Sequence, residues 1–294
     1  MTAHMRLGFH APQTEEELSK LVVEAAESRT PLEIMGKGTK REIGHPVRAG
    51  AVVSTENMKG ITLYEPTELV MVAKSGTPLT EIEAALAEND QELACEPVDI
   101  APVLGYGPGE GTVGGLVATN ISGSRRILKG AVRDHVLGVT AVNGRGEIIK
   151  SGGRVMKNVT GYDLARTLVG SWGTLAVLCE VALKVLPVQR ETRTLVFFGL
   201  TDFAAVEALC LAMGTPYEVS GTVHLQGPLA ARLSDADLAG NGAVTAIRVE
   251  SFPASARYRT SRLREALLAY GPRLELDTDR SQTFSKDVRS LKMF

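Results

Sequence analysis

The chain has 294 residues, a net charge of −2, and 44% hydrophobic and 22% charged residues. This composition supports a folded core and excludes wholesale disorder, and the near-neutral charge gives no electrostatic reason to expect binding to nucleic acid or an anionic membrane. The length suits two domains or one large one. Glycine is unevenly distributed along the chain, because sixteen of the 30 glycines lie between residues 105 and 173.

The first quarter of the chain alternates helical and strand patterns. Residues 14–29 predict an amphipathic helix, with Thr14 and Glu17 in the spacing of a capping box. Residues 78–89 predict a second helix, for which Thr77 is the expected cap and Pro78 the first-turn residue. Short apolar runs between the two helices predict strands at 31–35, 51–54, 61–64 and 69–73.

The glycine-rich middle of the chain predicts loops joined by a few regular elements. Proline and glycine make 95–111 irregular, and 112–120 can open a short helix. Further expected elements are a hairpin turning at Asn143-Gly144, a helix over 160–170, and a strand over 173–187 that ends at Pro187. In that strand Val177, Cys179, Val181, Leu183 and Val185 are expected on one apolar face, opposite Glu180 and Lys184.

The composition and the secondary-structure pattern of the chain change after Pro187. Glycine becomes less frequent, and the patterns read strand, helix, strand, strand, helix. This order is typical of a ferredoxin-like domain. The sequence therefore predicts an α+β protein with a boundary near 187–193.

Metal and membrane signals are weak. The three cysteines are far apart in the sequence, and neither they nor the five histidines show the spacing of a metal or iron–sulfur motif. The first residues lack the apolar stretch of a signal peptide, and no apolar run approaches the roughly 20 residues that span a bilayer. We expect no metal site and a reducing, cytoplasmic location.

Two glycine clusters are candidates for ligand binding. Gly36–Lys40 directly follows a predicted strand, where glycine amides, Thr39 and a lysine at position 37 or 40 could receive a phosphate, although a plain turn explains the same residues. Gly109, Gly111 and Gly114 formally match the dinucleotide-binding fingerprint. No buried strand precedes them, so a Rossmann site is disfavoured, and no P-loop is present.

Order and spacing of these loops resemble the FAD-binding domain of the vanillyl-alcohol-oxidase (PCMH) type. Gly36–Lys40 resembles its pyrophosphate loop, Gly111–Asn120 its flavin-side loop, and Gly170–Leu175 its last flavin-contacting turn. Within that family, Gly153–Asp163, Glu96-Pro97 and Gly123–Arg126 are similar to the E subunit of bacterial glycolate oxidase.

The resemblance implies a PCMH-type FAD-binding domain of two α+β subdomains at 1–187. A ferredoxin-like cap domain follows at 188–294. The cap is expected to be incomplete, because related subunits continue beyond this point and end in a segment with no counterpart here.

The resemblance also assigns candidate cofactor residues. Non-covalent FAD is expected, since no histidine lies in 34–40. The positions that match the family pattern are Met35, Gly36, Lys37, Gly38, Thr39, Lys40, Thr112, Gly114, Gly115, Ala118, Thr119, Ser122, Gly123, Gly173, Thr174 and Val177. Each has a structural alternative, since a glycine can serve only a turn and a threonine only a cap. Trp172 could pack on the cofactor or fill core.

The implied function is that of the FAD subunit of a multi-subunit glycolate oxidase. Glycolate, a 2-hydroxy acid, would be oxidised to glyoxylate by hydride transfer to flavin. Electrons would then pass to an iron–sulfur subunit beside a homologous FAD subunit. The complex could lie on the cytoplasmic face of the inner membrane. Alternatives are a self-sufficient 2-hydroxy-acid dehydrogenase and a scaffold subunit without flavin.

No catalytic residue is assigned from the sequence. His135 and His224 are the tempting bases, but His135 is better explained by the fold. Arg125-Arg126 is a donor cluster that a solvated turn explains equally well, and Arg133-Asp134 is best explained as a structural ion pair.

Overall fold

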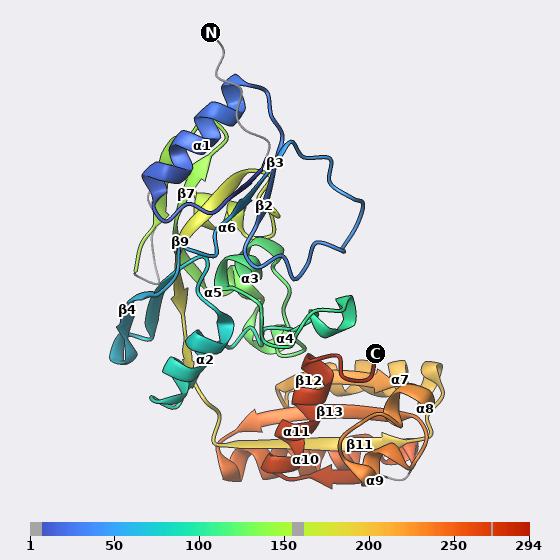
Figure 1. Ribbon diagram of the computed structural model, residues 1–294. Helices are drawn as coiled ribbons and strands as arrows, with labels where there is room; N and C mark the ends of the chain where they lie inside the picture. Colours follow the sequence, from blue (N-terminus) through green and yellow to red (C-terminus); the bar gives the residue numbers. More distant parts are fainter. Residues whose placement is uncertain (1–7, 155–161, 272) are drawn as a thin grey trace. The chain divides into compact units, whose positions relative to one another are not determined.

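The computed structural model describes residues 8–154, 162–271 and 273–294 (Figure 1). Its contacts divide the chain into two units. The first holds the described residues up to Ile121 together with those of Ala131–Pro187. The second holds Val188–Phe294 and also the short segment Ser122–Gly130. The chain therefore passes between the units three times, at 121/122, 130/131 and 187/188.

The first unit begins with a small parallel sheet covered by one helix. Strand order is β1-β3-β2, with β1 at Phe9–His10, β2 at Leu32–Met35 and β3 at Ala51–Ser54. Helix α1 (Glu15–Glu27) begins as predicted, because the Thr14 hydroxyl accepts the amide of Glu17 at 3.2 Å. Its apolar face buries Leu18, Val22 and Ala25.

A five-stranded antiparallel sheet forms the rest of the first unit. Its order is β4-β5-β9-β7-β8. The strands are β4 (Ile61–Glu65), β5 (Val70–Lys74), β7 (Val136–Asn143), β8 (Ile148–Gly152) and β9 (Ala176–Lys184). The predicted hairpin is confirmed as β7–β8. A separate short pair joins β6 (Gln91–Glu92) to β10 (Leu186–Pro187).

Short helices connect these strands. They are α2 (Leu79–Ala87), α3 (Val113–Thr119), α5 (Val132–His135) and α6 (Leu164–Leu168), with 3₁₀ turns at Pro66–Glu68 and Pro102–Leu104. The predicted cap of the second helix is wrong. Thr77 instead donates its hydroxyl to the carbonyl of Lys74 at 2.6 Å, and Pro78 occupies the N-cap position of α2. The predicted start of α6 at 160–161, and most of the family motif at 153–163, lie outside the described residues.

Strand β9 corrects a second prediction. Val177 and Cys179 pack with α1, whereas Val181 and Leu183 pack in the core that contains α2 and α3. The apolar face switches because the pairing with β7 skips Cys179, a β-bulge between Thr140 and Ala141. A bulge inserts one residue, so the side chains that follow it point to the opposite face.

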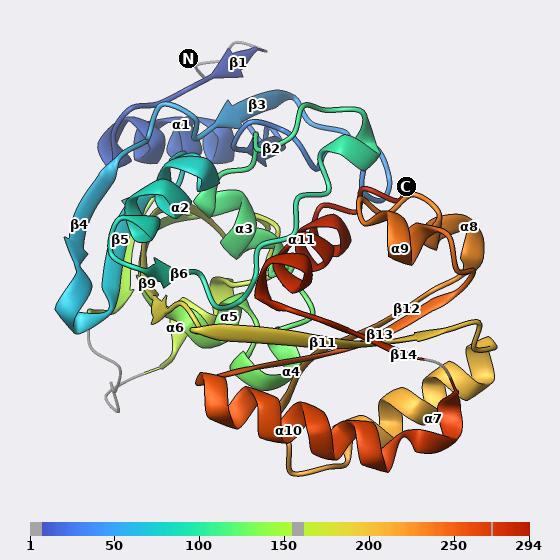
Figure 2. The ribbon, with the colours of Figure 1, turned by 90° about the horizontal axis from the view of Figure 1, so that it is seen from below.

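The second unit contains one antiparallel sheet with helices on both faces (Figure 2). Strand order is β12-β13-β11-β14, the split βαβ order of a ferredoxin-like fold. The elements are β11 (Glu191–Phe198), α7 (Asp202–Met213), β12 (Val219–Leu225), α8 (Gly227–Ala230), α9 (Ala236–Ala239), β13 (Val244–Ser251), α10 (Pro253–Ala266), a 3₁₀ turn (Leu268–Tyr270), β14 (Arg273–Leu276) and α11 (Thr278–Arg289). The predicted strand–helix–strand–strand–helix order is confirmed.

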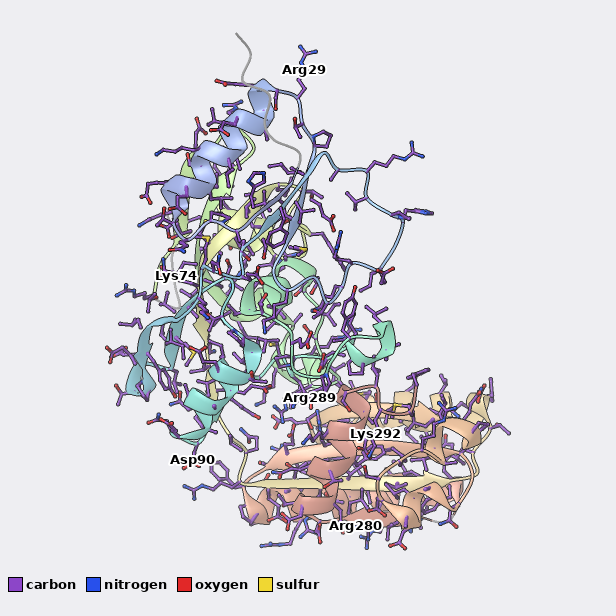
Figure 3. The ribbon with its side chains drawn as sticks, in the orientation of Figure 1. Arg29, Lys74, Asp90, Arg280, Arg289 and Lys292 are labelled. Atoms are coloured by element: carbon purple, nitrogen blue, oxygen red, sulfur yellow. The ribbon has the colours of Figure 1, made fainter. Side chains whose placement is uncertain are left out.

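Side chains along β11 alternate between the two faces of this sheet and contribute to the core on each face. Leu195 and Phe197 pack with α7 and α10, while Val196 packs on the other face with α8, α9 and α11. Helix α11 carries Arg280, which is labelled in Figure 3. Its guanidinium donates to both carboxylate oxygens of Asp235 at 2.7 and 2.9 Å, which holds the helix in place. The segment Ser122–Gly130 contains α4 (Arg126–Lys129), which lies against β12.

Candidate functional site

A cavity of about 360 Å³ opens in the first unit beside the end of β2. Its walls come from β2 and the loop after it, from Thr55 and Ser75 at the ends of β3 and β5, from α3, and from β9 with the turn before it. Fourteen of the sixteen residues predicted from the sequence line it, and they are Met35, Gly36, Lys37, Gly38, Thr39, Lys40, Thr112, Gly114, Gly115, Ala118, Thr119, Gly173, Thr174 and Val177.

The loop after β2 is tightly held against the rest of the unit. The carbonyl of Gly36 accepts the hydroxyl of Ser54 at 2.9 Å. Arg41 donates two hydrogen bonds to the carboxylate of Glu33, at 2.6 and 2.8 Å. A Cβ at Gly36 would lie only 2.5 Å from Oγ1 of Thr112, so this position has no room for a side chain. The loop therefore keeps its backbone exposed along the cavity wall.

Helix α3 meets that loop at its first turn. Oγ1 of Thr112 accepts the amide of Gly115 at 3.2 Å, which caps the helix. The amide of Gly114 donates to the carbonyl of Ser75 at 2.8 Å, and a Cβ at Gly114 would lie 2.7 Å from Cβ of Ser75. Glycine is therefore needed at 114 for the helix to approach the strand end this closely.

Lys40 supplies positive charge at the same place. Its Nζ lies 4.0 Å from the position that a Cβ of Gly115 would occupy. Burial lowers the pKa of Lys40 from its ordinary value, and the nearby carboxylate of Asp99 partly opposes that shift. An ammonium group that has lost hydration gains strongly from an anion placed beside it.

The turn before β9 closes the remaining side. Trp172 and Gly173 have positive φ values of 54° and 74°. The amide of Trp172 donates to the carbonyl of Ala118 at 2.9 Å, which ties the turn to α3. Apolar walls from Ile34, Ala118 and Val177 face the cavity together with Trp172. The site thus combines a cationic, glycine-rich end with flat apolar walls.

Comparison with known proteins shows which cofactor-binding domain the first unit contains. Residues 7–152 match the model of the FAD-binding domain family. These residues belong to that family. The glycolate oxidase subunit GlcE of Escherichia coli is 41% identical over 79% of this chain and 62% of its own length. A D-lactate dehydrogenase of Archaeoglobus fulgidus is 33% identical over 63% of this chain and 40% of its own.

Solved structures share the fold at low sequence identity. An alkyldihydroxyacetonephosphate synthase superposes with a TM-score of 0.73 and 17% identity, covering 97% of this chain and 54% of the other. A p-cresol methylhydroxylase superposes with a TM-score of 0.71 and 13% identity, covering 97% of this chain and 62% of the other. The chain is thus an α+β flavoprotein fold of the PCMH type, and it spans about 62% of the length of its GlcE relative.

The cavity fits FAD on its own geometry. The backbone of residues 36–40 lines the cavity, and its amides could receive phosphate oxygens. The ammonium of Lys40 could balance phosphate charge, and the apolar walls beside Trp172 suit a flat ring system.

Ser122 and Gly123 are not among the described residues that line the cavity, so their contact with FAD stays a prediction. Asn120 ends α3 in the left-handed conformation with φ of 54°, and the chain then leaves the first unit. The residues that follow belong to the second unit. There Arg125 donates two hydrogen bonds to the carboxylate of Glu250, at 3.1 and 2.7 Å.

Several lining residues had no motif to reveal them. Ser75 and Thr55 line the cavity from the ends of β5 and β3, and Ile43 and Val47 from the long loop after β2. Oγ of Ser75 is buried without a hydrogen-bond partner among the described residues. A serine or threonine directly after a predicted strand, in VVST and AKSGT, is the only signal that could have found the first two.

The two histidines considered as candidate bases are not among the described residues that line the cavity. His224 is in the second unit, where its ring nitrogens contact Oγ1 of Thr245 at 2.8 Å and a carboxylate oxygen of Asp202 at 3.1 Å. His135 is buried at the end of α5 and is not among the described residues that line the cavity. The described residues contain no cluster of side chains able to hold a metal. They also contain no helix long and apolar enough to cross a membrane.

Proposed function

We propose that this chain is the FAD-binding subunit of a multi-subunit glycolate oxidase. The observation that carries the proposal is the FAD-type cavity in a chain that is 41% identical to a protein named as a glycolate oxidase subunit. The Bacillus subtilis glycolate oxidase subunit GlcD is a second such relative, at 30% identity over 63% of this chain.

The roles of the cavity residues follow from their chemistry. Backbone amides of residues 36–40 hold the pyrophosphate, with Lys40 as counter-charge. Residues from Thr112 to Thr119 and from Gly173 to Val177 line the ribityl and ring portions, and Trp172 shields the ring from water. FAD, when bound, accepts a hydride from the CH–OH carbon of the substrate, and the protein orients and tunes it.

Removal of the proton from the substrate hydroxyl needs a base, and none of the described residues that line this cavity is a histidine. Among the described lining residues the ionisable side chains are Glu33, Lys37, Lys40 and Arg41, and the Glu33–Arg41 pair is committed to holding the loop. We therefore propose that the chain binds FAD but oxidises little substrate alone. The homologous FAD subunit and an iron–sulfur subunit then complete the reaction and take up the electrons.

Anaerobic mixing experiments test the proposal. The purified chain should carry FAD, visible in its absorbance spectrum, and glycolate should reduce that FAD slowly. Addition of the homologous FAD subunit and the iron–sulfur subunit should restore rapid glycolate oxidation. D-lactate serves as the comparison substrate.

Other results would select other functions. Rapid reduction of the isolated chain by glycolate or D-lactate would establish a self-sufficient 2-hydroxy-acid dehydrogenase. A colourless protein whose spectrum and stability FAD does not change would establish a scaffold subunit. Either outcome overturns the proposal as stated.

A further inference from the structure

Helix α7 of the second unit is apolar on both of its faces. Its inner face buries Ala205, Ala208 and Ala212 against the sheet. Its outer face exposes Phe203 by 75%, Val206 by 58% and Met213 by 41%, with Cys210 also exposed. A helix on the surface of a soluble domain normally shows polar residues on its outer side, so this face is unusual.

The exposed apolar residues follow a regular spacing. Phe203, Val206, Cys210 and Met213 are separated by three, four and three residues, so they form one stripe along two to three turns. We call these four residues the α7 stripe. The 3-4-3 spacing is that of a coiled-coil seam, which packs against another helix rather than against a flat surface.

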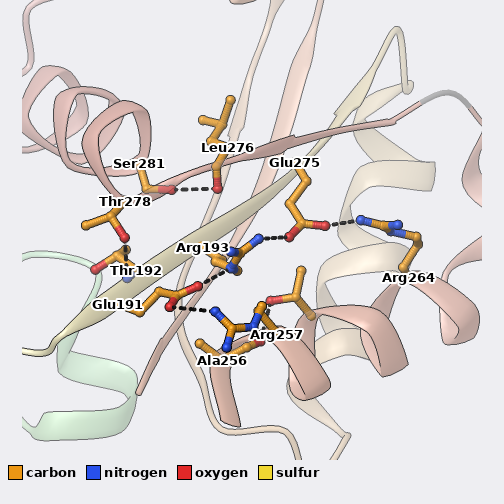
Figure 4. Close-up of polar contacts among 11 residues, drawn as sticks. Glu191, Thr192, Arg193, Ala256, Arg257, Arg264, Glu275, Leu276, Thr278 and Ser281 are labelled. Carbon is orange, nitrogen blue, oxygen red and sulfur yellow. Dashed lines mark hydrogen bonds and ion pairs between the residues drawn. The ribbon is translucent and has the colours of Figure 1, made fainter. Parts of the chain in front are cut away.

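Helix α10 covers the same face of the same sheet and shows the contrast (Figure 2). Its outer residues are mainly arginines, and these pair within their own unit. Arg257 and Arg264 contact Glu191 and Glu275, and both acids also contact Arg193 (Figure 4). Helix α10 thus exposes Tyr258 among charged residues, whereas α7 exposes a continuous apolar stripe.

Charge selects the kind of helix that fits the α7 stripe. The only charged residues of α7 are Asp202 and Glu207, both acidic. Asp202 is engaged by His224 and Gln226. Glu207 flanks the stripe and has no ion-pair partner within the described part of the chain. A docking helix with lysine or arginine beside its own apolar stripe would supply that partner.

The same charge argues against a second copy of this chain. Two α7 helices packed antiparallel about the centre of the stripe would bring the two Glu207 carboxylates together. A parallel pair would align Asp202 with Asp202 and Glu207 with Glu207. Like charges at a helix interface oppose association, and no basic residue of α7 relieves them.

We propose that the α7 stripe is the docking surface for an amphipathic helix of a partner subunit, with basic residues flanking the apolar stripe of that helix. The inference rests on the proposed function only in taking the partner to be a subunit of the same oxidase. It predicts that assembly depends on a helix of the second unit that does not contribute to the FAD cavity of the first.

A peptide-binding experiment tests the chemistry directly. The probes are a 14-residue amphipathic peptide of leucine and lysine, and a matched peptide with glutamate in place of lysine. The basic peptide should bind the wild-type chain at least ~10-fold more tightly than the acidic one. The double variant F203E/V206E should weaken that binding at least ~10-fold, because it places charge in the apolar seam.

Matched variants separate this surface from general effects. Y258E changes an aromatic on α10 that is 60% exposed and should leave peptide affinity within ~2-fold. E207K should remove the preference for the basic peptide while leaving the fold intact, since the side chain is exposed. Equal binding of the basic peptide to wild type and F203E/V206E would overturn the proposal.

Assembly is then measured with the whole subunits. Light scattering of the chain co-purified with the homologous FAD and iron–sulfur subunits should show loss of a partner in F203E/V206E and not in Y258E. A wild-type dimer that F203E/V206E abolishes would assign the stripe to a second copy and overturn the partner assignment. Burial of the α7 stripe by further residues of a longer form of the chain would also overturn the partner assignment.

Flavin absorbance of the same samples separates this proposal from the proposed function. A colourless wild-type chain that still binds the basic peptide through α7 would count against the proposed function alone. A chain that carries flavin and whose assembly is unchanged in F203E/V206E would count against the α7 assignment alone.

Discussion

Gly36 and Gly114 show why the cavity needs glycine at particular residues rather than flexibility throughout. Neither has a positive φ, and at both a Cβ would collide, with Thr112 in one case and Ser75 in the other. The glycines therefore serve close approach, of the loop to the side chain of Thr112 at Gly36 and of α3 to Ser75 at Gly114. That approach places the loop after β2 and the start of α3 around one cavity.

Replacing Gly36 with alanine tests this reading. The added Cβ would push Thr112 away from its capping position, and overpacking of this kind costs about 1–3 kcal/mol. We expect FAD affinity to fall ~5- to 150-fold, measured by equilibrium titration of the flavin absorbance. Gly144→Ala is the control, because nothing lies near its Cβ position and its φ is not positive. Equal affinities of the two variants would remove Gly36 from the site.

Lys40 provides a second residue-scale prediction, through pH. Its pKa in the free protein is below the ordinary 10.5, and bound pyrophosphate would raise it again. The contribution of Lys40 to FAD affinity is therefore complete below the free-state pKa and is lost as pH rises through the pKa in the complex. Lys40→Met should weaken FAD binding ~10- to 150-fold near neutral pH, as expected for a charge-assisted hydrogen bond.

The pH profile distinguishes charge from packing. The ratio of wild-type to Lys40→Met affinity should shrink as pH rises toward 10.5, because the wild-type ammonium is lost while the variant has none. Flavin ionisation affects both proteins equally and cancels in the ratio. A ratio that stays constant across this range would show that Lys40 contributes only packing.

At the scale of elements, Ser122–Gly130 is the segment that local reasoning misplaced. Arg125 and Glu250 are 125 residues apart in sequence, and their side chains are only 12% and 2% exposed. Burial alone would raise the pKa of Glu250, but the charges of Arg248 and Arg125 and the hydroxyl of Ser220 lower it below its ordinary 4.5. The pair therefore fastens this segment to the sheet of the second unit.

Glu250→Ala should destabilise the second unit by ~3–5 kcal/mol at pH 7, because it leaves buried arginine uncompensated. The pKa of Glu250 is lowered by folding, so its stabilisation is present above pH 4.5 and is lost as pH falls through the lowered native pKa. The difference from wild type should thus shrink on acidification, as measured by urea unfolding followed by circular dichroism.

Glu265→Ala is the matched control for that experiment. Glu265 pairs with Arg262 on the outside of α10, with both side chains about half exposed, and such pairs contribute ~0–1 kcal/mol. A Glu250 variant as stable as the Glu265 variant would show that Ser122–Gly130 is not fastened by this pair.

At the scale of the whole molecule, every described residue of the FAD cavity belongs to the first unit. Trp172, the single tryptophan of the chain, lies in that cavity and so reports on the first unit alone. FAD should quench Trp172 fluorescence on binding. At 100 times its dissociation constant, FAD should stabilise the first unit by ~2.7 kcal/mol.

Riboflavin is the matched ligand for this prediction. It has the ring but lacks the phosphates that the 36–40 loop and Lys40 receive. It should therefore raise the Trp172-monitored melting temperature less than FAD does at equal concentration. Equal shifts from the two ligands would show that the glycine loop does not bind the pyrophosphate.

Much of this molecule could be predicted from local sequence because its signals are local. Thr14 caps α1 through a residue three positions away, β7–β8 turns at Asn143-Gly144, and the strand–helix order after Pro187 follows from side-chain periodicity. Short glycine motifs that resemble those of the FAD-binding family likewise indicated fourteen of the cavity residues. These features depend on residues within a few positions of one another.

Tertiary structure alone decided the rest, because the deciding contacts join residues far apart in sequence. The bulge at Cys179 turned part of β9 to the other core, and β5 brought Ser75 against Gly114 to complete the cavity wall. Ser122 and Gly123 followed the FAD motif in sequence, yet the buried Arg125–Glu250 pair assigns their segment to the second unit. The energy of a long-range ion pair or a bulge depends on where the partner strand lies, which spacing along the chain does not encode.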